Sequence, residues 1–300
     1  MNTNRAVRTE KRERQRDSMD LTRRFVFRGN ASAIAGQIFR PKTIIVDVNC
    51  GGSSLGVSGG RSQAQIKGQS FGEIIKFGSA FTLAEGLFDD AKLAAAVTDH
   101  KGRQSDLDST TTVTAETRGV SVGVKPVVTL KRVRGTLVSR APRGSGEPSI
   151  APARDTTIQG VSVGGYGLVV DLNVGLFQKY DTRSKVLAAA DDPKVLDKNP
   201  THFVVGATIE GQRTGRGLIQ RYGVLYTTIV RELRWEKKPY PGAKIDGHRV
   251  IVPDFGTVYF GELFVHSSER RMTMVRFELG SPWGGYADVG DVSSNGSGFP

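Results

Sequence analysis

Residues 256–280 read GTVYFGELFVHSSERRMTMVRFELG, and this stretch decides the fold class. Two apolar runs, 257–266 and 271–279, are separated by a short polar turn. The second run alternates with a period of two, and its predicted core-facing residues are Thr273, Val275, Phe277 and Leu279. Its opposite face holds Met272, Met274, Arg276 and Glu278. The pattern predicts an antiparallel hairpin with one buried face and one partly solvated face.

The composition of the whole chain agrees with this hairpin. The 300 residues include 37 glycines and 12 prolines, and many of the others are Val, Thr and Ile, which suits short strands joined by turns. We predict a mainly β protein, built as an antiparallel sandwich or as barrel-like sheets. Two short helices are expected, at about 89–100 and 181–192, because each begins with a capping Asp or Thr and the second meets Pro193.

Three further patterns predict strands. Residues 110–116 alternate so that Thr110, Thr112, Thr114 and Glu116 face outward while Thr111, Val113 and Ala115 face inward. The string Gly-Val-Ser-Val-Gly occurs at 119–123 and again at 160–164, and each copy leads into an alternating strand. We interpret the copies as two similar hairpin units, with a chance match as the alternative. Residues 218–233 predict one long basic strand.

The predicted organisation has five parts. Residues 1–18 form a disordered basic arm, because they carry almost no apolar side chain. Residues 19–140 and 155–292 form two β-rich halves, which build either one domain or two. The range 141–154, APRGSGEPSIAPAR, is rich in Pro, Gly and Ser and predicts a linker or a long loop. Residues 293–300 predict a frayed tail.

Charge points to acidic partners. Lys and Arg number 42 against 30 Asp and Glu, a net charge of +12, and residues 1–40 contribute ten positive and four negative groups, a net of +6. The arm residues that would contact a nucleic acid are Arg5, Arg8, Arg12, Arg14 and Arg16. Basic and aromatic residues are also interleaved at 218–238, and we predict ligand binding by Arg221, Arg231, Arg234, Trp235, Lys237 and Lys238.

No catalytic residue, metal ligand or cofactor is predicted. Cys50 is the single cysteine, and the four histidines are too widely spaced for a zinc motif. His248 and His266 are expected at the surface. The glycine-rich stretch 49–61 lacks the Lys-Ser or Lys-Thr pair of a phosphate-binding loop, so it predicts a turn region. One cysteine and no secretory pattern predict a cytoplasmic protein, and no apolar run approaches the roughly 20 residues of a membrane helix.

Three segments resemble proteins of one group: RFVFRGNASAIAGQIFRP at 24–41, GLFQKYDTRSK at 175–185 and VPDFGTVYFGELFVHSSERRMTMVRFELGSPWGG at 252–285. The group consists of uncharacterised bacterial proteins. The resemblance extends over residues 25–300 and implies a shared fold. It implies no activity, cofactor or role for any residue.

Three functions remain open at this point. The first is a non-enzymatic β-rich protein that binds a ligand or assembles into a larger structure. The second is a nucleic-acid or polyanion binder that uses the basic arm and the basic strand at 218–238. The third is a hydrolase whose residues converge only in the fold. The expected partners are accordingly a polyanion or further copies of the chain.

Overall fold

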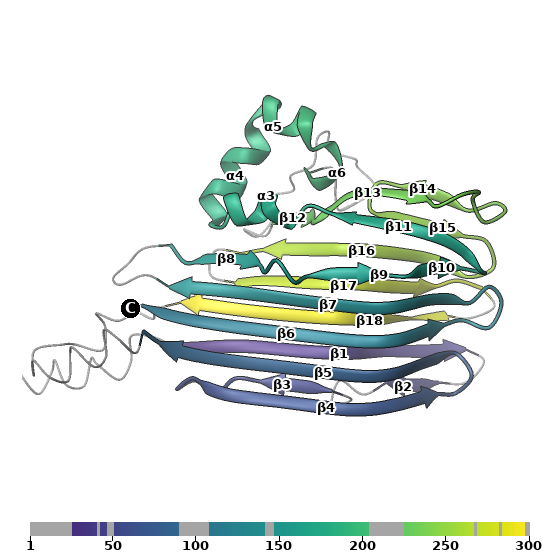
Figure 1. The fold of residues 1–300 in the computed structure, drawn as a ribbon, viewed down its shortest axis with the longest axis horizontal. Helices are drawn as coiled ribbons and strands as arrows, with labels where there is room; N and C mark the ends of the chain where they lie inside the picture. The colour runs from purple at the N-terminus through teal and green to yellow at the C-terminus, as the bar shows by residue number, and fades with distance from the viewer. Residues whose placement is uncertain are drawn as a thin grey trace, which may run out of the picture.

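The computed structural model describes residues 26–40, 43–46, 51–89, 108–141, 147–203, 225–266, 269–281 and 284–297. In these ranges, two antiparallel sheets of nine strands each pack face to face, and four short helices lie at one margin (Figure 1). The predicted mainly β class with antiparallel sheets is confirmed, in the form of a sandwich. The hairpin predicted from residues 256–280 is also confirmed, because it forms two neighbouring strands of the first sheet.

Sheet A contains strands from both ends of the chain. Its members are β1 (Val26–Arg40), β2 (Ile44–Val46), β3 (Gly52–Ser54), β12 (Leu225–Thr228), β14 (Lys244–Asp246), β15 (Arg249–Val252), β16 (Gly256–Val265), β17 (Glu269–Leu279) and β18 (Gly284–Ser297). The order is β14-β15-β16-β17-β18-β1-β2, with β12 also paired to β16 and β3 to β1. Strand β18 therefore lies between β17 and β1.

Sheet B is built on a meander of four long strands. Its members are β4 (Gly60–Phe71), β5 (Ile75–Phe88), β6 (Ser109–Val122), β7 (Val128–Ala141), β8 (Ser149–Pro152), β9 (Thr157–Gln159), β10 (Val161–Val163), β11 (Tyr166–Leu172) and β13 (Val230–Trp235). The order is β13-β11-β10-β7-β6-β5-β4, and β8 and β9 also pair with β7. In Figure 1, β4 forms the margin opposite the helices.

The helices lie between β11 and β12 in the chain: α3 (Val174–Lys179), α4 (Arg183–Asp191), α5 (Pro193–Lys198) and α6 (Pro200–Phe203). Helix α4 confirms the helix predicted at 181–192, and Thr182 caps it by accepting a hydrogen bond from the backbone N–H of Lys185 at 3.3 Å. Helix α4 ends just before Pro193, as predicted, and Pro193 itself begins α5, where its missing N–H costs nothing. The helix predicted at 89–100 lies outside the described residues beyond Asp89.

The core lies between the inner faces of the two sheets. Alternation in β6 is as predicted for Val113 and Ala115, which are fully buried, and for Thr112, which is partly exposed, whereas Thr114 and Glu116, predicted to face outward, are also buried. The sheets approach closely at Gly135, where an added Cβ would lie 2.8 Å from the Cγ of Met274. The hydroxyl of Thr117 donates to the carbonyl of Ala33 at 2.8 Å and so links β6 to β1 across the core.

In sheet A, the alternation of inward-facing and outward-facing side chains is interrupted at one row of residues that crosses the strands. The pairing of β1, β18, β17 and β16 steps over one residue in each strand, namely Ala33, Gly290, Met274 and Gly261. The two glycines have φ values of 70° and 59° respectively. Beyond the row, the opposite set of side chains faces the core. The predicted inward face of β17 is therefore correct for Val275, Phe277 and Leu279 but wrong for Thr273, which faces outward, whereas Met272 is fully buried.

In sheet B, a similar row of residues interrupts the alternation. This row accounts for the repeated Gly-Val-Ser-Val-Gly sequence. The pairing steps over Gly68, Gly78, Gly119 and Lys131, and the Lys131 N–H donates to the carbonyl of Gly160 at 3.2 Å. The two copies of Val-Ser-Val then pair with β7 from opposite sides. Their leading glycines have φ values of 64° and 62°, a conformation that favours glycine. The copies are thus equivalent neighbours of one strand.

Other predictions are corrected by the strand bounds. The long strand predicted at 218–233 does not exist as one element, because β12 belongs to sheet A and β13 to sheet B, with Ile229 between them. Residues 293–297, within the range predicted as a frayed tail, end β18 and pair with β1. The range 141–154 includes β8, and strands from both sides of this range contribute to both sheets. None of the helices in the described ranges is long and apolar enough to cross a membrane.

Candidate functional site

The residues predicted to bind a ligand fall into two groups. The arm residues and Arg221 lie outside the described ranges. The remainder lie on the edge strand β13 and in the turn that follows it. There, the Nε of Arg231 donates to Asp171 at 2.8 Å, Trp235 packs against the core, and the Lys238 ammonium lies 5.5 Å from the ring centroid of Tyr166. Arg231, Lys238 and the indole of Trp235 therefore all interact with other parts of the protein.

A different set of basic residues lies together on the outer face of sheet B. It consists of two rows that cross the strands on either side of the interrupted row. The first row holds Lys67, Ser79, Arg118 and Arg132, and the second holds Ser70, Lys76, Ser121 and Thr129. We call these eight residues the basic band. It contains four cations, four hydroxyl groups and no carboxylate.

Between the two rows, the backbone of the sheet is uncovered. Gly68, Gly78 and Gly119 are neighbours on β4, β5 and β6, and all three are exposed. A Cβ added at Gly119 would meet no atom closer than the Gly78 nitrogen at 3.4 Å. Because this strip carries no side chains, an extended ligand could approach the backbone closely while the band residues contact it from both sides.

Two band arginines belong to a cluster around Glu116, which lies next to Arg118 along β6. One carboxylate oxygen accepts from the Nε of Arg118 at 2.6 Å. The other accepts from Arg132 and from Arg134, each at 2.9 Å. Burial alone would raise the pKa of Glu116, but the hydrogen bonds from Arg132, Arg134 and Arg118 outweigh it and lower the pKa to about 2. The carboxylate is therefore ionised at every physiological pH and fixes the guanidinium groups in place.

A second polar cluster lies on the outer face of sheet A. Arg276 donates to both oxygens of the buried Glu262 carboxylate, at 2.6 and 2.7 Å, and the Tyr226 hydroxyl donates to the same group. Each charge is thus paired within the fold. The Nε2 of His248 lies 3.6 Å from Glu262, which is too long for a hydrogen bond. Among the residues that the structure describes, no group of three or more His, Cys, Asp or Glu could hold a metal ion.

His248 corrects a prediction, because it is buried rather than at the surface. Burial, and then the charges of Arg249 and Arg276, lower its pKa to about 4, so the ring is neutral at pH 7. His266 is exposed, as predicted. The signal for burial was weak in the sequence, since His248 follows a turn and its contacts come from a strand that lies beside it only in the fold.

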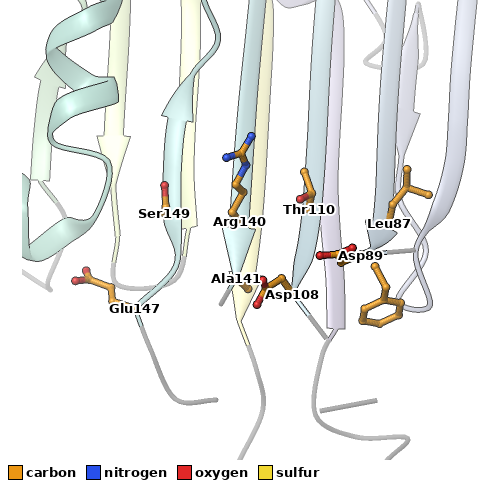
Figure 2. Close-up of a pocket in the computed structure, with 9 residues that line it drawn as sticks. Leu87, Asp89, Asp108, Thr110, Arg140, Ala141, Glu147 and Ser149 are labelled. Atoms are coloured by element: carbon orange, nitrogen blue, oxygen red, sulfur yellow. The ribbon is translucent and has the colours of Figure 1, made fainter. Parts of the chain in front are cut away.

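A pocket lies at the end of sheet B, where β5, β6 and β7 meet the chain leading into β8. Its volume is about 540 Å³. Figure 2 shows Leu87 at one side of the pocket and Glu147 at the other, with Asp108 and Arg140 between them. Phe88 also lines the pocket. Glu147 already accepts hydrogen bonds from Ser184. The described ranges break off beside this pocket, at Asp89, Asp108, Ala141 and Glu147, and we assign it no ligand.

The basic band was not predicted, although its members could be read from the sequence. The alternation of β6 places Arg118 on the outward face with Glu116, and this placement can be predicted from the sequence alone. The cross-strand neighbours were not, because Lys67, Lys76 and Arg132 meet Arg118 only through the strand order and register of sheet B.

Fold and surface together define a large antiparallel β-sandwich with a basic band across one outer face. The sequence model of a domain family described as a domain of unknown function (DUF8256) matches residues 25–266, and the chain belongs to this family. The resemblance to uncharacterised proteins is confirmed in that respect. No curated protein and no solved structure matches the chain.

Proposed function

We propose that this protein is a non-enzymatic binding protein whose ligand is a polyanion, bound on the outer face of sheet B. The observation that carries the proposal is the basic band, in which four cations flank an uncovered glycine strip, while Glu116 beside the band pairs with Arg118 and Arg132. A polyanion gains affinity from such a surface by releasing its counterions. The net charge of +12 supports the same ligand class.

The proposed contact surface, the basic band, differs from the surface predicted from the sequence. The predicted contacts of residues 1–18 and of the basic residues near β13 stay predictions, and they would add to the band rather than replace it. The cytoplasmic location also stays a prediction. It is compatible with a polyanionic ligand such as a nucleic acid.

The test compares two pairs of substitutions that remove the same charge. Lys76→Ser with Arg118→Ser alters the band, whereas Lys194→Ser with Lys198→Ser alters exposed residues of α5. Binding of the full chain to a single-stranded DNA and to heparin is measured by fluorescence anisotropy at several salt concentrations. We expect the band pair to weaken binding and to flatten the log-affinity against log-salt slope by about 0.7 for each phosphate of the single strand that the variant no longer neutralises.

Two outcomes would overturn the proposal. One is the absence of measurable binding to either probe at about 50 mM salt, where phosphate contacts are strongest. The other is an equal reduction of affinity in the two pairs, because net charge alone would then account for binding. Preference for DNA over heparin, or the reverse, identifies the source of the anionic groups.

Self-assembly is a second candidate function, favoured by β4. This 12-residue strand is exposed along most of its length, and β5 is the only described strand paired with it. An unpaired edge of this length is a template for pairing with another chain, although Arg61 and Lys67 are residues of the kind that discourage it. Light scattering over a range of concentrations tests the idea: we expect a mass above 32.4 kDa at high concentration. A monomer throughout would contradict it.

A further inference from the structure

Arg118 and Arg132 face each other directly across β6 and β7. Like charges in directly opposite positions destabilise a sheet unless an anion lies between them. Both side chains are accessible, with 59% and 32% of their surfaces exposed. The repulsion between the two guanidinium groups therefore lowers the stability of the sheet. The neighbouring charges determine whether the protein itself offsets this repulsion.

The charges in the cluster do not balance. Three guanidinium groups, those of Arg118, Arg132 and Arg134, meet two carboxylates, Glu116 and Asp155. Three positive and two negative charges leave a net of +1. Because the pKa of Glu116 is lowered to about 2, its protonation never changes this sum in the neutral range.

The hydrogen-bond donors show where the surplus charge is available. Each guanidinium has five N–H donors. Arg134 uses all three of its nitrogens, with Nη1 on Glu116 and with Nε and Nη2 on Asp155. Arg118 uses only Nε and Arg132 only Nη2, both on Glu116. Within the described part of the chain, the remaining nitrogens of Arg118 and Arg132 have no partner, and the Nε of Arg132 is buried without one.

We infer that Arg118 and Arg132 form a discrete site for one singly charged oxyanion group, a phosphodiester or a sulfate ester. One negative charge brings the cluster to neutrality, and the oxygens of such a group match the paired N–H donors of guanidinium groups. The exposed Gly119, next to Arg118, leaves room for the ester substituents to continue along the glycine strip. The inference deepens the proposed function, since it names the group on the polyanion that is bound most specifically.

The test uses two small probes, sodium dimethyl phosphate and sodium methyl sulfate, with sodium chloride at equal ionic strength as the reference. Arginine Nε–H signals of the full chain are followed by NMR, and Arg118→Gln and Arg132→Gln assign them. We expect saturable shifts of these two signals with one or both probes, and an affinity about tenfold lower in either variant, as expected when a charge-assisted bond is removed. The probe with the higher affinity distinguishes a phosphodiester from a sulfate ester.

Lys76→Gln is the matched control, because Lys76 belongs to the basic band but not to the cluster. It should weaken binding of single-stranded DNA or heparin without changing binding of the small probes. Shifts equal to those in sodium chloride, or equal affinities in Arg118→Gln and the parent protein, would overturn the site even if polyanion binding is normal. Conversely, probe binding without polyanion binding would leave the site intact and refute the proposed function. Circular dichroism confirms that each variant is folded.

Discussion

Asp288 carries a charge that its surroundings disfavour. Burial and the neighbouring Asp291 raise its pKa to about 6, and the Arg271 guanidinium, 4.0 Å away, offsets this only in part. In the unfolded chain the pKa is about 3.9. Between about pH 4 and pH 6 the folded protein therefore binds more protons than the unfolded chain, so this group lowers the stability as the pH rises through that window.

We predict that Asp288→Asn stabilises the protein at pH 7.5 by about 1 to 3 kcal/mol, because the neutral amide removes the cost of the buried charge. The gain should disappear near pH 4, where the aspartic acid is itself protonated. Urea unfolding of both proteins at the two pH values measures this. His248, with its pKa lowered to about 4, makes stability fall as the pH drops below 6.5, but this contribution is common to both proteins and cancels in the difference.

A less stable Asn variant at pH 7.5 would mean that the ion pair with Arg271 outweighs the cost of burial. The burial of Asp288 and of His248 was not predicted from the sequence. Periodicity places a residue on one face of a strand, and it did so correctly for Phe277, which is fully buried. It does not tell which side chains of neighbouring strands enclose a polar residue, and that enclosure sets the pKa.

At the scale of elements, the interrupted rows limit what periodicity can predict. The hairpin of β16 and β17, helix α4 and the alternation of β6 all follow from local patterns. The inward face of β17 was predicted correctly only on one side of Met274, because a period of two assumes an uninterrupted ladder. The split between β12 and β13 was missed for a similar reason: Ile229 continues the apolar pattern while the chain passes from one sheet to the other.

Gly119 offers a direct test of the row in sheet B. Its φ of 64° is a conformation that costs other residues about 1 to 2 kcal/mol, although a Cβ there would meet nothing closer than 3.4 Å. We predict that Gly119→Ala lowers the free energy of unfolding by about this amount. The effect is measured by urea unfolding.

Gly56→Ala is the matched control for this substitution. A Cβ at Gly56 would meet no atom within 4 Å, and its φ lies outside the left-handed region, so the alanine variant should equal or slightly exceed the parent in stability. Equal stability of Gly119→Ala and the parent would show that the backbone relaxes at the row. The strain argument for the Gly-Val-Ser-Val-Gly repeat would then be wrong.

At the scale of the whole molecule, the two β-rich parts on either side of 141–154 cannot be separated in space. Strands β1–β3 lie in sheet A with β14–β18, and β8–β11 lie in sheet B with β4–β7. Strand order of this kind depends on contacts between residues far apart in the chain, which local sequence patterns do not encode. The basic band was missed for the same reason, whereas the β class and the overall positive charge needed only composition.

The position of β18 has a consequence for how the protein is made. Val26 pairs with Ser297, so β1 obtains its main partner only from the far end of the sequence. During synthesis the meander of β4–β7 can form early from neighbouring segments, but β1 must wait on the ribosome until β18 emerges. Until then the edge of β1 that pairs with β18 has no partner. We expect a chaperone that shields this edge of β1 before β18 is available to raise the yield of folded protein.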